Sequence, residues 1–184
     1  MIQLAHAQLV AQELIELLNP FCDRIEIAGS VRRKKNICKD IELVIIPKKQ
    51  IEKTGLFGDE ETTYYPIDNF ILYNPLFRLR PNKNGGTSYG EKNKLLEYNH
   101  KEYGWIALDI FTADESNYMM VKFIRTGGAE TNKLIATTAN KYKMNLRIYE
   151  SCFEDRRGNK YVMKSEEEIF RLLGLNYLPP EKRA

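Results

Sequence analysis

Two short stretches organise this sequence: Gly29-Ser30-Val31-Arg32-Arg33 and, ten residues after Ser30, Asp40-Ile41-Glu42-Leu43. Side chains alternate between the two faces of a strand, so Asp40 and Glu42 are predicted to share one face. Two adjacent carboxylates repel each other unless a cation lies between them. Oxygen ligands suit a hard ion such as Mg²⁺, which is usually held by one or two carboxylates together with substrate phosphates. The second stretch therefore predicts a divalent cation site on a strand.

The first stretch is suited to binding the phosphates of a substrate. A tight turn at Gly29-Ser30 offers backbone N–H groups, and Ser30 adds a hydroxyl. Arg33 adds a guanidinium group that can hold a phosphate through two parallel hydrogen bonds. The two stretches together predict a site where a metal ion and a phosphate group meet.

Three later motifs extend this pattern. Leu108-Asp109-Ile110 places an acid within an apolar strand, where a buried aspartate without a partner is rare. A second motif opens a predicted helix and reads Arg125-Thr126-Gly127-Gly128-Ala129-Glu130-Thr131-Asn132. The third is a C-terminal helical run over residues 165–175, followed by Pro179-Pro180-Glu181-Lys182-Arg183.

Together these motifs resemble those of the family X DNA polymerases, the polymerase-beta-like nucleotidyltransferases, from about residue 20 to the C-terminus. Many nucleotidyltransferases share the three acids, whereas the run over residues 125–132 and the C-terminal run are more specific to family X. The resemblance implies metal-dependent transfer of a nucleotide from a nucleoside triphosphate to a 3′-hydroxyl. The partners that it implies are the nucleotide and a DNA primer with its template.

The resemblance also implies a role for each candidate site residue. Asp40, Glu42 and Asp109 would be the catalytic residues and the ligands of two Mg²⁺ ions, or of Mn²⁺ in their place, with Asp109 nearest the attacking hydroxyl. Gly127 would let the backbone approach the sugar closely, and Asn132 would contact the incoming nucleotide. The implied nucleotide-binding residues are Gly29, Ser30, Arg33, Gly127 and Asn132.

The fold class that the resemblance implies is α/β (α+β): a mixed palm sheet flanked by helices, followed by a small α+β thumb. We expect the palm to span residues 1–112 and the thumb residues 113–184. Family X polymerases usually carry an N-terminal lyase domain and a fingers region, and we expect this chain to be a minimal form without them.

Apolar periodicity and turn signals predict the individual elements. A helix is expected over residues 3–18, since Asn19-Pro20 follows the apolar stripe. A Ser165-x-x-Glu168 capping box predicts another near the C-terminus. Further predictions are strands at 23–28, 40–47, 70–73, 76–80, 94–99, 103–112, 144–149 and 160–163, a helix at 129–142, a helix or extended segment at 118–124, a helix or loop at 48–63 and a loop at 81–90.

Composition sets broad limits on the class of protein. The chain has 184 residues, 43% of them hydrophobic, and a formal net charge of +3, which permits a polyanionic partner without requiring one. No apolar run approaches membrane-spanning length and the N-terminus lacks the shape of a signal peptide, so we expect a cytoplasmic monomer that does not bind membranes. The three cysteines have no CxxC spacing and are expected to be reduced.

Three positions depart from the family pattern. Glu42 replaces the usual aspartate, although its longer side chain can still ligate a metal. Ile124-Arg125 replaces an aromatic pair beside the sugar, which predicts weak selection against ribonucleotides. Ala136 replaces an arginine with which template-directed members often check the base pair.

These departures leave three hypotheses open. The first is a minimal family X DNA polymerase that extends a primer or fills a short gap. The second is a template-independent terminal nucleotidyltransferase, or a transferase that acts on RNA or another acceptor. The third is a nucleic-acid-binding protein without catalytic activity, against which the retained acids at the three ligand positions argue.

Overall fold

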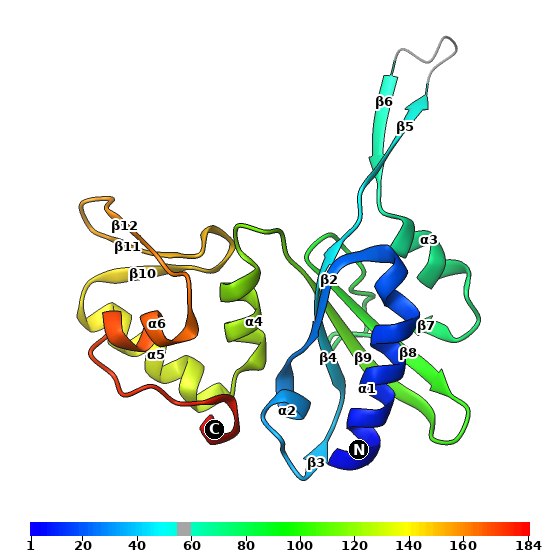
Figure 1. Cartoon of the computed structure of the whole chain (residues 1–184), viewed down its shortest axis with the longest axis horizontal. Helices are drawn as coiled ribbons and strands as arrows, with labels where there is room; N and C mark the ends of the chain where they lie inside the picture. Colours follow the sequence, from blue (N-terminus) through cyan, green and yellow to red (C-terminus); the bar gives the residue numbers. More distant parts are fainter. Residues whose placement is uncertain (55–59) are drawn as a thin grey trace.

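The computed structural model describes residues 1–54 and 60–184, and a five-stranded mixed sheet forms the centre of its first lobe (Figure 1). The strand order is β2-β4-β9-β8-β7, in which β4 and β9 run parallel and the other neighbours run antiparallel. The strands are β2 (Cys22–Ile27), β4 (Ile41–Pro47), β7 (Phe77–Leu79), β8 (Asn93–His100) and β9 (Gly104–Thr112). The predicted strands at 23–28, 40–47, 76–80, 94–99 and 103–112 and the α+β fold class are therefore confirmed.

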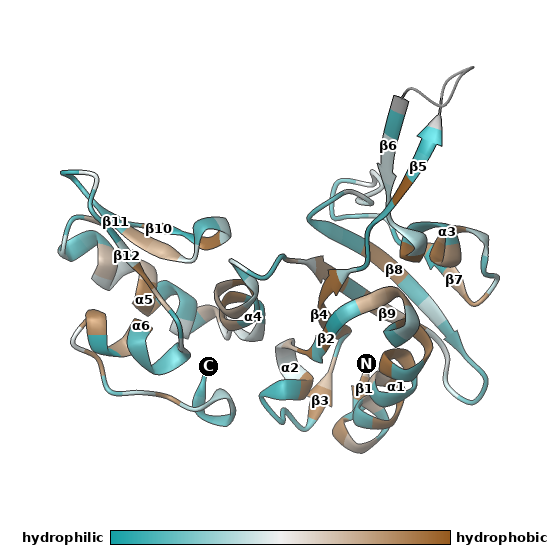
Figure 2. Cartoon of the chain, turned by 45° about the horizontal axis from the view of Figure 1, so that its top comes forward, coloured by the Kyte–Doolittle hydropathy of each residue, from teal (hydrophilic) through white to brown (hydrophobic). Residues whose placement is uncertain are grey.

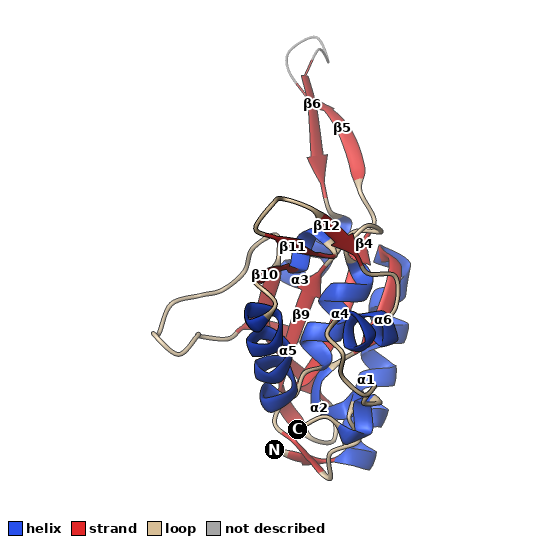
Figure 3. Cartoon of the chain, turned by 90° about the vertical axis from the view of Figure 1, so that its left-hand side faces the viewer, coloured by secondary structure: helices blue, strands red, loops and turns tan. Residues whose placement is uncertain are grey.

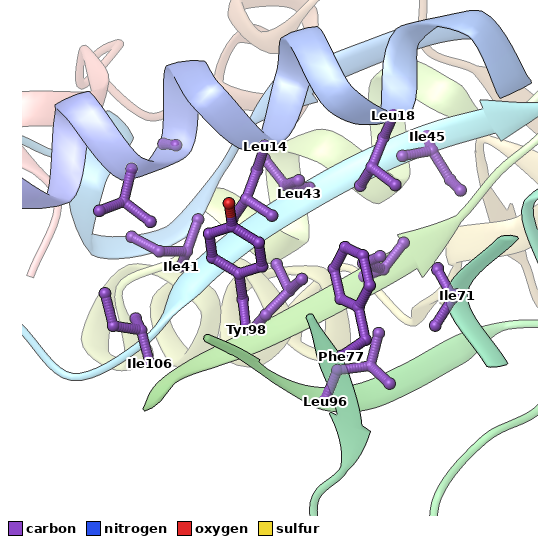
Figure 4. Close-up of a cluster of buried hydrophobic side chains, with 14 of the residues drawn as sticks. Leu14, Leu18, Ile41, Leu43, Ile45, Ile71, Phe77, Leu96, Tyr98 and Ile106 are labelled. Atoms are coloured by element: carbon purple, nitrogen blue, oxygen red, sulfur yellow. The ribbon is translucent and has the colours of Figure 1, made fainter. Parts of the chain in front are cut away.

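Helix α1 (Leu4–Leu18) covers one face of this sheet, as its apolar stripe predicts (Figure 4). Leu14 and Leu18 of α1 are fully buried, and they pack in one cluster with Ile41 and Leu43 of β4 and Tyr98 of β8. Each such side chain contributes about 1.5–3 kcal/mol to folding through its removal from water. Because side chains alternate along a strand, the odd-numbered residues of β4 fill this core and Glu42 is turned to the opposite face.

Residues 66–73 form a helix, not the predicted strand at 70–73. Helix α3 (Pro66–Tyr73) begins with a proline in its first turn, where the missing N–H group costs nothing. Ile67 and Ile71 are four residues apart and both are buried against the sheet core. A short apolar run fits a strand or a helix equally well, and here the spacing of the buried residues decides for the helix.

The expectation of a helix or loop over residues 48–63 is also wrong where the structure describes this segment. Strands β5 (Gln50–Thr54) and β6 (Glu60–Tyr64) pair with each other in a hairpin that projects from the sheet (Figures 1 and 3), and residues 55–59 lie outside the described residues. Figure 2 shows hydrophilic or intermediate residues along most of it. Since no core covers either face, the sequence has no clear alternation there to predict it.

The second lobe combines three helices with a small antiparallel sheet. Helices α4 (Tyr118–Thr126), α5 (Ala129–Lys141) and α6 (Glu166–Leu172) surround a core that includes Phe123, Ile135 and Phe170. Its sheet has the order β10-β11-β12 and consists of β10 (Met144–Arg147), β11 (Cys152–Asp155) and β12 (Lys160–Val162). The predicted elements at 129–142, 144–149 and 160–163 are confirmed, whereas β11 was not predicted.

Smaller elements complete the chain. Strands β1 (Ile2–Gln3) and β3 (Ile37–Cys38) pair beside α1, and α2 (Gly29–Arg32) follows β2. Single 3-10 turns span Asn19–Phe21, Ile148–Glu150 and Pro180–Lys182. The predicted cap is present, because Ser165 accepts a hydrogen bond from the backbone N–H of Glu168 at 3.3 Å. Over residues 1–54 and 60–184, no helix is long and apolar enough to cross a membrane.

Helix α4 joins the two lobes. Tyr118 and Val121 of α4 are buried against Val44 and Ile46 of β4 and Phe111 of β9. These strand residues lie on the face of the sheet opposite α1, so α4 covers part of the face that carries Glu42. The predicted division between residues 112 and 113 falls at the end of β9 and stays a prediction.

Candidate active site

The Gly29-Ser30 segment forms a helical turn, α2, and not the predicted tight turn. Gly29 has a φ of +58°, a backbone conformation that residues with a Cβ rarely adopt. A Cβ at this position would overlap the carboxylate of Glu42. The backbone of Ala28 is also tied to β4, since its N–H donates to the carbonyl of Glu42 at 2.8 Å. Gly29 therefore lets the phosphate-binding candidates lie directly against a candidate metal ligand.

Two of the three predicted acids lie side by side on neighbouring strands. Glu42 of β4 and Asp109 of β9 are partners in the register of the parallel pair. Asp40 lies one residue before β4, so the prediction that it shares a strand with Glu42 is wrong in detail. Asp40 nevertheless stays close enough for its charge to affect both other acids.

The pKa of Glu42 reflects its burial and the charges of the two other acids. Burial raises the pKa of Glu42 to about 7, and the negative charges of Asp40 and Asp109 add to this rise. The positive charges of Arg33 and Arg125 act in the opposite direction without cancelling it. Burial also raises the pKa of Asp109, against the opposing effect of an ion pair with Arg80. Burial is thus the largest cause of both shifts, and the neighbouring acids add to it.

Arg80 pairs with Asp109 and was not among the predicted site residues. It follows β7, and its backbone N–H donates to the carbonyl of Leu95 at 3.0 Å, which extends the pairing of β7 with β8. Leu95 is in turn the register partner of Asp109. The sheet register, and not a local motif, therefore brings Arg80 to the acid. As the side chains lie, no three His, Cys, Asp or Glu residues within the described ranges form a ready set of metal ligands.

A hollow of about 360 Å³ lies beside the acids on the side of α2. The residues that line it are Ser30, Arg33, Lys35, Ile37, Lys39, Asp40 and Glu42. The hydroxyl of Ser30 and the Nε–H of Arg33 are buried and have no hydrogen-bond partner among the described residues. A buried polar group without a partner costs roughly 1–3 kcal/mol, so both groups are suited to a polar ligand.

One of the two predicted thumb residues, Gly127, lies close to Arg33 at the edge of this hollow. Its guanidinium donates a hydrogen bond to the carbonyl of Thr126. A Cβ at Gly127 would lie only 3.2 Å from the same guanidinium, which shows how closely the backbone approaches it. Asn132 donates from Nδ2 to the carbonyl of Ile124 at 2.9 Å, and its Oδ1 is buried without a partner within the described residues. The structure therefore brings Gly127 to Arg33 of the palm, whereas the hydrogen bond of Asn132 lies within the second lobe.

Arg125 is a further site residue whose role the sequence pattern did not indicate. Its guanidinium stacks on the ring of Phe111, 3.9 Å from the ring centroid. Its charge opposes the rise in the pKa of both Glu42 and Asp109. In the sequence this residue was only a replacement for an aromatic residue, and no local pattern showed that it faces the acids.

An ion-pair network ties the two lobes together next to the site. Glu166 of α6 binds Arg32 of α2 at 2.6 Å and Arg183 of the C-terminal segment at 2.5 Å. Arg183 is fully buried, and its guanidinium lies 4.8 Å from the ring centroid of Phe123. Arg32 directly precedes Arg33, so this network holds the phosphate-binding candidates against the second lobe.

Comparison with known proteins supports the resemblance seen in the motifs. Residues 123–184 match the family of DNA polymerase beta thumb domains. The whole chain is similar to the crystal structure of polymerase beta from Leishmania infantum in a ternary P/T complex, with a TM-score of 0.74 and 17% sequence identity. The match covers 100% of this chain and 76% of that one. No curated protein matches the sequence. The chain thus has a polymerase-beta-like fold, and its C-terminal third resembles the family X thumb.

Proposed function

We propose that this chain is a metal-dependent nucleotidyltransferase that adds a nucleotide from a nucleoside triphosphate to a 3′-hydroxyl. The form that we favour is a family X DNA polymerase for primer extension or short gap filling. One observation carries the proposal: Glu42 and Asp109 stand in register beside a basic hollow that contains unpartnered polar groups. The polymerase-beta-like fold over the whole chain supports it.

The donor set fits hard divalent cations. Asp40, Glu42 and Asp109 would hold two Mg²⁺ or Mn²⁺ ions through carboxylate oxygens, the ligands that such ions prefer. When bound, the metals would activate the attacking hydroxyl and neutralise charge on the phosphates. The raised pKa of Glu42 is consistent with a site whose acids need added positive charge. Asp109 pairs with Arg80 through Oδ1, so Oδ2 is the oxygen that would bind a metal while this ion pair persists.

The residues of the hollow would bind the triphosphate. The free hydroxyl of Ser30 and the Nε–H of Arg33 would donate to phosphate oxygens and stabilise the charge that develops on the leaving group. Gly127 would let the sugar approach the backbone, and Asn132 would offer its free Oδ1 to the nucleotide. Because Arg33 touches both lobes, it would couple nucleotide binding to the position of α4 and α5.

A DNA primer with its template is the partner that we propose, because a P/T complex of a polymerase beta has the same fold. A protein that binds nucleic acid without catalysis is less consistent with the site. Such a protein would gain nothing from buried, unpartnered groups at Ser30 and Arg33, which cost free energy until a ligand binds them.

A template-independent terminal transferase is the alternative that one observation favours. Ala136 lies on the exposed surface of α5, and its methyl side chain has no hydrogen-bonding group with which to check a base pair. If other residues do not check the pair, the choice of nucleotide would not depend on a template base. Transfer to RNA or another acceptor belongs to the same alternative.

Primer extension tests the proposal and separates its two forms. A labelled DNA primer is incubated with Mg²⁺ or Mn²⁺ and one nucleotide at a time, with and without a template. Addition of only the complementary nucleotide on the templated primer would establish a templated polymerase. Addition without a template would establish the terminal transferase. A lack of transfer to DNA and to RNA primers under all conditions would refute the proposed function.

A further inference from the structure

We infer that a second site, separate from the acids, binds a nucleoside that carries no phosphate. It lies at the ends of β4 and β9, where the β5–β6 hairpin leaves the sheet (Figure 1). It consists of an inner hollow of about 220 Å³ and an outer hollow of about 680 Å³. Pro47, Tyr65, Glu91 and Thr112 line both hollows, which therefore adjoin each other. The proposed function does not depend on this second site.

The inner hollow lies on the face of the sheet opposite the acids. Thr112 follows Asp109 by three residues in β9, so the alternation of side chains turns the two to opposite faces. Ile67 and Asp68 also line the hollow, and they belong to α3, which packs on the same face as α1. Ligands of open α/β sheets commonly bind beyond the carboxyl ends of the parallel strands, and β4 and β9 are the parallel pair here. The acids of the candidate active site line neither hollow.

Three polar side chains of the inner hollow have hydrogen-bonding capacity left. Thr112 Oγ1 is buried and has no partner among the described residues. Asp68 accepts from the Tyr89 hydroxyl at 2.7 Å and pairs with Lys94 at 2.9 Å, both through Oδ1, and among the same residues Oδ2 has no partner. Lys94 is only 4% exposed, and its ammonium also donates to the carbonyl of Gly90 at 3.1 Å, which leaves a third N–H. These groups can both donate hydrogen bonds to a ligand and accept them from it.

The walls of the inner hollow fit a flat ring. The rings of Tyr65 and Tyr89 and the side chains of Pro47 and Ile67 line it. Aromatic side chains stack on any nucleobase, because every base has a π face. A base also carries donors and acceptors along its edge, which match the mixed polar groups of the hollow. Flat apolar walls beside such groups therefore favour a nucleobase over an aliphatic ligand.

The outer hollow fits a sugar but not a phosphate. The acids that line it are Asp23, Glu91, Asp114 and Glu115. Only two cations, Lys49 and Lys92, line it as well, and the ammonium of Lys92 lies 4.1 Å from the ring centroid of Tyr149. Carboxylates accept hydrogen bonds from sugar hydroxyls, whereas their charge repels a phosphate. The ligand is therefore a nucleoside, in contrast to the triphosphate proposed for the basic hollow beside Glu42.

Thr112→Val tests the inference, because it removes the unpartnered hydroxyl and keeps the shape of the side chain. Thr63→Val is the matched control, since Thr63 is exposed in β6. Equilibrium dialysis measures the binding of radiolabelled adenosine, guanosine, cytidine and uridine, each supplied singly in EDTA. At least one nucleoside should bind wild type and Thr63→Val with a Kd of about 0.1 mM, the affinity typical of a ligand of this size. Thr112→Val should raise this Kd roughly tenfold.

Urea unfolding separates binding from a structural role of the hydroxyl. A buried hydroxyl without a partner adds nothing to the fold, so Thr112→Val should be at least as stable as wild type. A clear loss of stability in this variant would mean that the hydroxyl has a structural partner, and it would overturn the inference.

Competition and a second variant locate the bound nucleoside. The triphosphate of the same base should not displace it at equal concentration, and Ser30→Ala should bind it as wild type does. Displacement by the triphosphate, or binding that is lost in Ser30→Ala and kept in Thr112→Val, would place the nucleoside beside the acids and overturn the inference. Wild-type protein that binds none of the four nucleosides would overturn it too. Primer extension decides the proposed function independently of each of these results.

Discussion

At the scale of single residues, Gly29 decides whether Glu42 can occupy its place. Gly29→Ala should lower the free energy of unfolding by about 1–2 kcal/mol through its positive φ alone, and further through overlap with the Glu42 carboxylate. Gly104→Ala is the control, since Gly104 has a φ of +68° with open space around it. Urea unfolding and transfer rates of both variants measure the difference. Equal losses of stability and activity in the two variants would contradict the contact between Gly29 and Glu42.

The pH dependence of stability reports on Glu42. Its pKa is about 7 in the folded protein and 4.5 in a model peptide, so between these values the folded state binds more protons than the unfolded state. Stability of the metal-free protein should therefore fall as pH rises from about 5 to 8. Urea unfolding in EDTA should show this fall, and Glu42→Gln should reduce it by about 1–3 kcal/mol over that range. A variant with the same pH dependence as wild type would show that Glu42 does not titrate in this window.

The sequence predicted Glu42, Asp109 and Arg33 as site residues but missed Arg80 and the role of Arg125. Glu42 and Asp109 each lie in a strand with a strong apolar pattern, and register then places them together. Arg80 reaches Asp109 across 29 residues of sequence, through the pairing of β7 with β8, and no local motif records that pairing. Arg125 likewise reaches the acids only because α4 packs on Phe111. Tertiary contacts of this kind cannot be inferred from spacing.

At the scale of elements, α6 depends on its ion pairs with α2 and the C-terminal segment. Glu166→Gln should destabilise the protein by about 3 kcal/mol, because it leaves the buried guanidinium of Arg183 without a charged partner. Glu167→Gln is the matched control, since Glu167 is exposed on the same helix. Denaturant unfolding compares the two variants. If both variants lost a similar free energy of unfolding, the ion pairs of Glu166 would add no more stability than an exposed glutamate does.

Elements with one clearly buried face could be predicted, and those without one could not. Helix α1 and strands β8 and β9 carry buried stripes of the expected period, and β4 is a run of apolar residues buried on both faces. The β5–β6 hairpin buries neither face, so its sequence shows no periodicity. Helix α3 is so short that its apolar run is compatible with a strand. The N-cap at Ser165 was predicted correctly because it is a local interaction, although the Glu168 carboxylate accepts from the N–H of Lys164 and not from that of Ser165.

At the scale of the whole molecule, two lobes meet around an acidic centre ringed by arginines and lysines. The net charge of +3 is small, so DNA binding should depend on the local basic groups and be weak and sensitive to salt. The logarithm of the binding constant should fall linearly with that of the salt concentration, with a slope of about −0.9 for each phosphate contact. Anisotropy titrations at salt concentrations from about 50 to about 200 mM measure this slope. A slope near zero would contradict binding through phosphates.

The most direct test of the central claim is single-nucleotide addition by wild type, Asp109→Asn and Asp23→Asn, with and without Mg²⁺. Asp23 is exposed and serves as the matched control. Asp109→Asn removes a ligand charge at constant volume, so the fold should persist while transfer falls by more than about a hundredfold. We expect extended primer only with metal, and only from wild type and Asp23→Asn. Full transfer by Asp109→Asn, or transfer by wild type that does not need a divalent cation, would contradict the assignment of these acids as the catalytic metal site.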